Sequence, residues 1–182
     1  MAQSRSINGR AVIIEDTRQQ ELKHRHIEKW MVAHGVCFAP RATALPFGDY
    51  MLEGSNISID TKKDVQEVAG NLGKQHARFA RECDKARAEG YRLIILIEEH
   101  PEYNDRKKLR AWKSYVCRRC RKCNPFEKSS KCAKYRVKPM NGNSIAKIIE
   151  RMEENHGVRF EFCHKRDTAR RICDILGVKY KE

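Results

Sequence analysis

The chain has 182 residues, enough for one well-buried domain with a small elaboration. Its 38 Lys and Arg outnumber its 24 Asp and Glu, and the net charge of +14 favours polyanionic partners. Nucleic acid is the first expectation, with an acidic membrane surface or a ribosomal neighbourhood as alternatives. No apolar run approaches the roughly 20 residues of a transmembrane helix, and residues 1–10 are too polar for a secretion signal. We therefore expect a cytoplasmic protein.

Short apolar runs alternate with helical patterns along the chain. The patterns predict strands at residues 11–15, 36–39, 49–52, 57–60, 93–97 and 158–162. They predict helices at residues 20–34, 65–90, 144–156 and 168–176, the second interrupted near Gly70 and Gly73. The turn formers at 54–56 predict a hairpin between the third and fourth strands. Strands that alternate with helices are typical of an α/β sandwich.

Residues 106–138 break this alternation with a dense basic segment in which Glu127 is the only acid. The segment holds four closely spaced cysteines: Cys117, Cys120, Cys123 and Cys132. Four thiolates in a short polar stretch predict a tetrahedral structural Zn²⁺ site, a zinc knuckle, and an iron–sulfur cluster is the open alternative. The remaining cysteines are dispersed among apolar neighbours and are expected to be buried free thiols: Cys37, Cys83, Cys163 and Cys173.

Basic side chains surround these cysteines, and we expect several of them to contact nucleic-acid phosphates: Arg118, Arg119, Arg121 and Lys122. The aromatic residues of the segment either pack against the knuckle or stack on bases, and packing is the simpler expectation: Trp112, Tyr115 and Phe126. Because a zinc ion with four thiolate ligands has no open position, hydrolytic chemistry is expected elsewhere in the chain.

Three acidic residues lie at the ends of predicted strands: Asp16, Asp49 and Asp60. The predicted hairpin brings Asp49 close to Asp60, and the two-residue period of a strand places Asp60 and Lys62 on one face. Phosphodiester hydrolysis uses such a set, because carboxylates hold Mg²⁺ or Mn²⁺ and a lysine orients water or stabilises developing charge. The spacing alone is weak evidence, since a solvated strand end in a charged chain gives the same pattern.

Three ordered motifs strengthen the interpretation. VIIEDTR, LPFGDYML and ISIDTKKD, followed by LIILIEE, together resemble the XPF-type nuclease core of the restriction-endonuclease-like superfamily over residues 12–99. In that family a strand ends in an Asp-x-Arg-Glu turn, a Gly-Asp-Tyr tripeptide or a similar one opens a strand, and Glu-Arg-Lys closes the next. The resemblance implies a central mixed sheet flanked by helices. Residues 1–182 would then form a single nuclease domain that carries the zinc-binding insert at 106–138.

The resemblance also implies roles for individual residues. The catalytic set would be Asp16, Asp49, Asp60 and Lys62, with the main-chain carbonyl of Thr61 as a further ligand of the Mg²⁺ or Mn²⁺ ion. Arg18 matches the family arginine and is expected to hold a phosphate or a carboxylate by a bidentate contact.

This sequence departs from the family pattern at three positions. Asp60 stands in place of Glu, Thr61 in place of Arg, and Gln19 in place of the acid that follows the first motif. Glu15 or Glu21 is the candidate replacement for that acid, so the number of metal ions stays open.

The resemblance implies a metal-dependent DNA endonuclease that cuts branched, flap or junction DNA in repair or recombination. Many such enzymes carry helix-hairpin-helix modules and act as dimers, but no such module is visible here. We therefore expect substrate choice to depend on the insert, a homodimer or a protein partner, and a compact version would suit a phage or mobile element. Two rivals are a non-catalytic nucleic-acid-binding adaptor of the same fold and an RNA-binding or ribosome-associated zinc protein, although the latter leaves the ordered acids unexplained.

Several polar residues near these motifs are expected to lie outside the catalytic set. Tyr50 alternates with Asp49 along the strand and should belong to the core. His24 and His26 are expected to be solvated or to contact phosphate, and Glu98 and Glu99 to be solvated at a strand end.

Overall fold

A computed structural model of the chain describes residues 11–19, 24–122, 132, 134–135 and 138–182. Within these residues six strands form one sheet in the order β2-β1-β3-β4-β5-β6. The strands are β1 (Val12–Asp16), β2 (Cys37–Thr43), β3 (Tyr50–Leu52), β4 (Ile57–Lys62), β5 (Arg92–Glu98) and β6 (Arg159–Cys163). β3 is antiparallel to both β1 and β4, whereas the other neighbouring pairs are parallel. The predicted mixed sheet is therefore confirmed.

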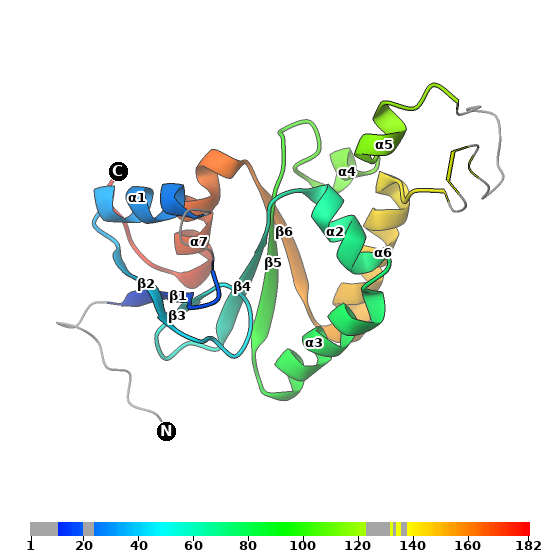
Figure 1. Ribbon diagram of the computed structural model, residues 1–182. Helices are drawn as coiled ribbons and strands as arrows, with labels where there is room; N and C mark the ends of the chain where they lie inside the picture. The colour runs from blue at the N-terminus through cyan, green and yellow to red at the C-terminus, as the bar shows by residue number, and fades with distance from the viewer. Residues whose placement is uncertain (1–10, 20–23, 123–131, 133, 136–137) are drawn as a thin grey trace.

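Helices pack on both faces of this sheet (Figure 1). They are α1 (Arg25–Ala33), α2 (Val65–Leu72), α3 (His76–Ala88), α4 (Arg106–Leu109), α5 (Tyr115–Arg118), α6 (Gly142–His156) and α7 (Thr168–Leu176), with a 3-10 turn η1 (Lys165–Asp167). α2, α3 and α6 cover one face, and α1 and α7 cover the other. In the described part of the chain, none of the helices has the length and apolar character needed to cross a membrane.

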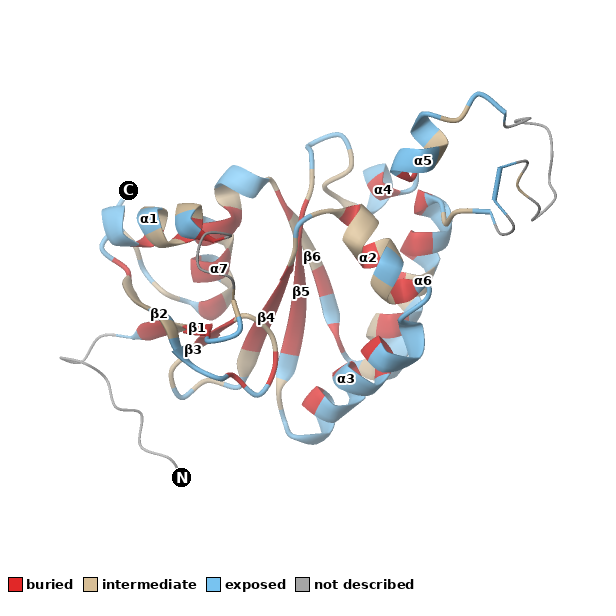
Figure 2. Cartoon of the chain, in the orientation of Figure 1, coloured by how far each residue is buried: buried red, intermediate tan, exposed pale blue. Residues whose placement is uncertain are grey.

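The core consists of two apolar layers, one on each face of the sheet (Figure 2). β5 contributes to both, because Ile95 and Ile97 pack under α2, α3 and α6 while Ile94 and Leu96 pack under α1 and α7. Burial of each such side chain contributes about 1.5–3 kcal/mol. A strand buried on both faces needs a continuous apolar run, which explains the LIILI sequence at 93–97.

The predicted hairpin is formed by β3 and β4, with Tyr50 opposite Ile59 and Met51 opposite Ser58. Gly54 lies in the turn with a φ of 75°, a backbone conformation that residues other than glycine rarely adopt. The predicted strand at 36–39 is longer in the structure, because β2 continues through Pro40 to Thr43. Proline is tolerated there because β2 lies at the edge of the sheet.

The basic segment begins within the core. Leu109 and Trp112 are buried under α6, although both lie inside the predicted insert. An antiparallel bridge then pairs Lys113 with Asn141, and the Gly142 N–H donates a 2.8 Å hydrogen bond to the Trp112 carbonyl. The chain therefore leaves the core after Lys113 and rejoins it at Asn141, and α5 stands where it leaves (Figure 1).

Candidate active site

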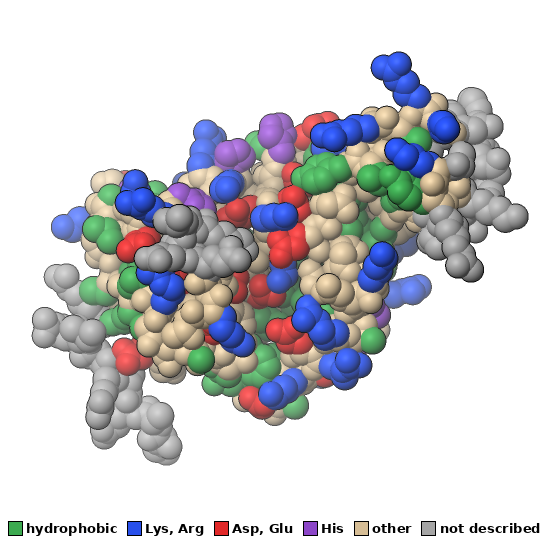
Figure 3. Space-filling model, viewed as in Figure 1, with side chains coloured by type: hydrophobic (Ala, Val, Ile, Leu, Met, Phe, Trp, Pro, Cys, Tyr) green, Lys and Arg blue, Asp and Glu red, His purple; other side chains and the backbone are tan. Residues whose placement is uncertain are grey.

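A cavity of about 240 Å³ opens where β1 and β4 end and β3 begins. It brings together side chains from three separated stretches: Asp16, Arg18 and Gln19 after β1, Asp49 before β3, and Asp60 and Lys62 on β4. Acidic side chains gather in the middle of this face of the molecule, with Lys and Arg side chains around them (Figure 3). The structure thus places the predicted acids and Lys62 around one cavity.

Asp60 and Lys62 form the most buried pair of this cavity. The Lys62 Nζ donates a 2.8 Å hydrogen bond to Asp60 Oδ1, and only 13% and 12% of the Lys62 and Asp60 side chains are exposed. Burial raises the pKa of Asp60, the ammonium of Lys62 lowers it, and the nearby charge of Asp49 raises it again, so that the pKa lies above its ordinary value. Burial opposes the charge of Lys62, but attraction to Asp60 outweighs it and raises the lysine pKa.

Asp49 is oriented by two polar neighbours. The amide and hydroxyl of Thr61 donate hydrogen bonds of 2.8 and 2.5 Å to Asp49 Oδ2, and Gln19 Nε2 donates to Oδ1. Gln19, which replaces the family acid, therefore positions Asp49. Gly48 precedes it with a φ of 66°, and a Cβ there would lie 2.7 Å from the Ile59 carbonyl oxygen. Only glycine allows the backbone to approach β4 this closely.

The carboxylate of Asp16, unlike those of Asp49 and Asp60, is bound mainly by Arg18. Its Oδ1 accepts hydrogen bonds from the backbone N–H and Nε of Arg18, at 2.7 and 2.8 Å, and its Oδ2 accepts from Arg18 Nη2 and the Leu45 N–H, both at 2.7 Å. Burial raises the pKa of Asp16, but these hydrogen bonds outweigh burial and lower it. A carboxylate has about four acceptor positions, and all are used here. A catalytic role for Asp16 would require Arg18 to release it.

Arg18 combines this contact with exposure. Two of its side-chain nitrogens bind Asp16, and Nη2 also donates to the Leu45 carbonyl at 2.9 Å. The Arg18 side chain nevertheless keeps 67% of its surface exposed at the cavity. Arg18 therefore holds a carboxylate by the expected bidentate contact, and its contact with a phosphate stays a prediction.

The donor set at Asp49 and Asp60 fits a divalent cation. Asp60 Oδ2 accepts no hydrogen bond from the described residues. Burial and, to a smaller extent, the negative charge of Asp49 raise the pKa of Asp60, and a bound cation would favour its charged form. Oxygen ligands of this kind suit Mg²⁺ or Mn²⁺. Among the described residues, no three His, Cys, Asp or Glu side chains are arranged to hold a metal, so the further ligands would come from the Thr61 carbonyl and water.

The zinc prediction falls partly outside the described residues. Cys117, Cys120 and Cys132 are described and half-buried, whereas Cys123 is not described. The three described cysteines are not arranged as a group that could hold a metal, so the structure does not show the zinc knuckle, which stays a prediction. Elsewhere, Cys83, Cys163 and Cys173 are buried free thiols as expected, and burial raises their pKa to about 12, 11 and 11. Cys37 was also expected to be buried, but it is only half-buried, because it lies on the edge strand β2.

Two charged residues of the cavity lie outside the set predicted from the sequence. Arg78 and Glu82 reach it from α3, on either side of the buried Phe79. Their spacing of four places them on the same face of the helix, which is the signal that sequence reasoning could have used. The charge of Glu82 also contributes to the raised pKa of Asp60.

The opposite face of the sheet holds a buried polar network that corrects two expectations. His24 is buried, not solvated, and its Nδ1 lies 2.6 Å from the Tyr50 hydroxyl, which donates a 3.0 Å hydrogen bond to Glu15. Tyr50 is fully buried, as predicted. Glu98 is also buried, not solvated, and accepts a 2.8 Å hydrogen bond from the Thr168 hydroxyl. Because Glu15 is committed to Tyr50, it does not replace the missing acid of the cavity.

His26 and Glu99, which were also expected to be solvated, are each partly buried. The His26 side chain is 38% exposed, with Nε2 3.9 Å from Glu98 Oε1, and burial lowers the pKa of His26. Glu99 accepts a 3.0 Å hydrogen bond from the Val65 N–H at the start of α2. Glu21 lies outside the described residues, so its proposed alternative role is not addressed by the structure.

Replacing Tyr50 by Phe should destabilise the protein by about 1–3 kcal/mol, because the buried Glu15 and His24 would each lose a hydrogen-bond partner. Denaturant unfolding measures the change in free energy. Tyr91→Phe is the control, since Tyr91 packs its ring beside Phe47 and its hydroxyl is not part of this network. Equal stability of the two variants would contradict the importance of the network.

No family model matches the chain, and no curated protein matches its sequence. Among solved structures, XPF from Aeropyrum pernix is similar, with a TM-score of 0.56 and 18% sequence identity. The match covers 91% of this chain and 60% of that chain, so the present chain corresponds to somewhat more than half of that structure. At this identity the likeness concerns the fold, and it agrees with the mixed sheet and flanking helices. The chain has an XPF-like fold.

Proposed function

We propose that the protein is a metal-dependent endonuclease that hydrolyses phosphodiester bonds of DNA. The observation that carries the proposal is the convergence of Asp49, Asp60 and Lys62 at one cavity. An XPF-like fold supports it, and so does the net charge of +14, which favours a polyanionic substrate.

Each residue of the cavity has a distinct task in this proposal. Asp49, Asp60 and the main-chain carbonyl of Thr61 would hold Mg²⁺ or Mn²⁺, which supplies Lewis acidity and makes water a stronger nucleophile. Lys62, held beside Asp60, orients the attacking water and stabilises charge that develops on the phosphate. Gln19 keeps Asp49 in place, and the exposed part of Arg18 binds a neighbouring phosphate.

The basic segment supplies DNA affinity in the same proposal. Its described cations are exposed and able to reach backbone phosphates: Arg118, Arg119, Arg121 and Lys122. Phosphate contacts position DNA without reading its sequence. Recognition would therefore depend on shape, and we propose branched, flap or junction DNA as the substrate, bound with the help of a second copy or a protein partner.

Cleavage assays with branched, single-stranded and linear duplex DNA test the proposal. We expect cleavage in Mg²⁺ or Mn²⁺, none in EDTA, and preference for branched DNA. DNA binding without cleavage in either metal would favour the non-catalytic adaptor. Tighter binding to RNA than to DNA, again without cleavage, would favour an RNA-binding zinc protein.

We also propose that Cys117, Cys120, Cys123 and Cys132 hold a structural Zn²⁺. Elemental analysis should find zinc and no iron, and removal of zinc by a chelator should weaken DNA binding, because the metal folds the segment that carries the arginines. The buried sheet should keep its circular dichroism signal. Visible absorbance from an iron–sulfur cluster, or a protein free of both metals, would refute this assignment.

A further inference from the structure

Arg118 occupies an unusual position for a residue of a basic segment. Its guanidinium carbon lies 5.1 Å from the ring centroid of Tyr103, 5.3 Å from that of Tyr115 and 5.9 Å from that of Trp112. Its Nε donates a 2.8 Å hydrogen bond to the Lys113 carbonyl, which fixes the plane of the guanidinium. The group is thus held among aromatic rings, an arrangement favoured by cation–π attraction.

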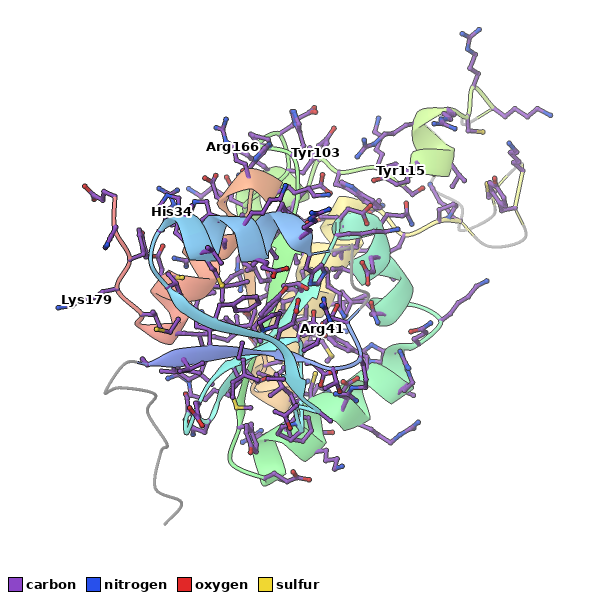
Figure 4. All side chains as sticks on the ribbon, turned by 60° about the vertical axis from the view of Figure 1, so that its left-hand side comes forward. His34, Arg41, Tyr103, Tyr115, Arg166 and Lys179 are labelled. Carbon is purple, nitrogen blue, oxygen red and sulfur yellow. The ribbon has the colours of Figure 1, made fainter. Side chains whose placement is uncertain are left out.

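Two of these three rings face the surface. Trp112 is buried in the core, but Tyr115 keeps 44% of its surface exposed, and Tyr103 is half-buried. Tyr103 and Tyr115 lie near each other along the upper edge of the molecule in Figure 4. Arg118 and the two tyrosines therefore form an exposed aromatic surface, which we call the Arg118 platform.

The platform is fixed to the fold at two points. The Tyr115 hydroxyl donates a 2.8 Å hydrogen bond to Asp64 Oδ2, and the Tyr115 N–H donates a 3.1 Å hydrogen bond to Gln66 Oε1. Exposed tyrosines usually lose conformational freedom when they bind a ligand, and here much of that cost is already met in the free protein. The ring is therefore prepared for contact with a partner.

The same hydrogen bonds connect the platform to the candidate active site. Asp64 caps α2 and follows Lys62 by two residues, so their Cα atoms are separated by no more than about 7 Å. Lys63 lies between them, and together with Asp64 and Tyr115 it lines an open hollow at the surface. A strand of nucleic acid that leaves the cavity over the end of β4 would meet Lys63 and then Tyr115.

We infer that the Arg118 platform stacks unpaired nucleotides of the DNA that is bound at the cavity. The inference rests on the proposed function for the identity of the bound polymer. Every base has a flat π face, which stacks on tyrosine rings and on guanidinium planes. In duplex DNA these faces are covered by neighbouring base pairs, so the platform selects single-stranded segments.

The charge around the platform favours nucleic acid over an apolar protein partner. Exposed cations that neighbour the platform residues in the sequence suit a phosphate backbone: Lys107, Lys108, Lys113, Arg119, Arg121 and Lys122. Glu102, which accepts a hydrogen bond from Tyr103, and Asp64 are the acids in direct contact with the platform. Glu67 lines the hollow beside Tyr115 as a third acid. The six cations exceed these three acids in number, as expected where a backbone passes.

Binding measurements in EDTA separate the platform from cleavage. The probes are a labelled single-stranded oligothymidylate, a single strand that contains 2-aminopurine, and a duplex of equal length. Tyr115→Ala should weaken single-strand binding about fivefold to a hundredfold, since stacking on one base contributes on this scale, and should leave duplex binding nearly unchanged. Quenching of 2-aminopurine fluorescence by the wild-type protein should be lost in this variant.

Two further variants distinguish stacking from folding and charge. Tyr115→Phe keeps the ring and should retain most of the single-strand affinity and the quenching, whereas Arg119→Ala removes a neighbouring charge and should weaken single-strand and duplex binding alike. Equal single-strand affinities of wild type and a folded Tyr115→Ala would overturn the inference. So would equal losses in Tyr115→Ala and Tyr115→Phe, or weaker binding of Tyr115→Ala to every probe.

The binding measurements test the Arg118 platform whether or not the protein cuts DNA. If single-strand binding depends on the Tyr115 ring but no cleavage occurs in Mg²⁺ or Mn²⁺, the stacking inference is supported and the nuclease proposal is contradicted. If cleavage occurs and Tyr115→Ala binds every probe like the wild type, the nuclease proposal is supported and the stacking inference is contradicted.

Discussion

Replacing Asp49 by Asn is expected to reduce DNA cleavage by at least about a hundredfold while DNA affinity stays nearly unchanged. The substitution preserves the size of the side chain but removes the charge that would hold a divalent cation beside Asp60. Loss of a single electrostatic group at a catalytic centre typically costs about 2.7–4 kcal/mol of transition-state stabilisation. DNA affinity depends mainly on the exposed cations, which this change leaves in place.

Single-turnover cleavage and DNA binding measured on the same preparations provide the test. Glu53→Gln is the matched control, because it also removes one negative charge from the β3–β4 hairpin but lies outside the cavity. Lys62→Ala should show a defect comparable to that of Asp49→Asn. Wild-type cleavage by either Asp49→Asn or Lys62→Ala would remove the assigned site from this cavity.

Gly142→Ala should lower the free energy of unfolding by about 3 kcal/mol or more, the upper range for overpacking. A Cβ at this position would lie 2.8 Å from the Trp112 nitrogen and would overlap the Leu109 carbonyl oxygen. Both neighbours are backbone atoms of a buried segment, so they cannot move aside as a flexible side chain would. For a protein of this size the melting temperature should fall by roughly 6–12 °C.

The sign of this effect is informative because glycine normally weakens a helix. Gly70→Ala in α2 is the matched control, since Gly70 is also helical, is exposed and has no atom within 4 Å of an added Cβ. This control should stabilise the protein by about 0.5–1 kcal/mol. Thermal unfolding of the two variants should therefore shift in opposite directions, and an unchanged or higher melting temperature for Gly142→Ala would contradict the close packing of α6 on Leu109.

Elements with a strong local pattern could be predicted from the sequence. The run LIILI requires burial on both faces, and the turn at Gly54 limits how the adjoining strands pair. The order of the three motifs also placed Asp49, Asp60 and Lys62 at one site, because the hairpin aligns the first two and strand periodicity aligns the last two.

Features that depend on contacts between distant segments could not be predicted in the same way. His24 lies in a basic stretch and Glu98 ends an apolar run beside Glu99, and their burial depends on Tyr50 and Thr168, which reach them from other elements. Likewise, the four donors that surround Asp16 include the Leu45 N–H, 29 residues away. A polar side chain becomes buried wherever the fold supplies its partner, and the local pattern does not contain that information.

The bridge between Lys113 and Asn141 has a consequence for how this protein can diversify. Because the two residues already lie side by side, the chain leaves and rejoins the fold at one point, and the entropy cost of closing a loop there grows only slowly with the number of residues between them. Insertions between them, beyond Tyr115 and its contacts with Asp64 and Gln66, would therefore cost the sheet little stability. New specificities can therefore be acquired by grafting at this position, without renewed selection on the apolar layers beneath it.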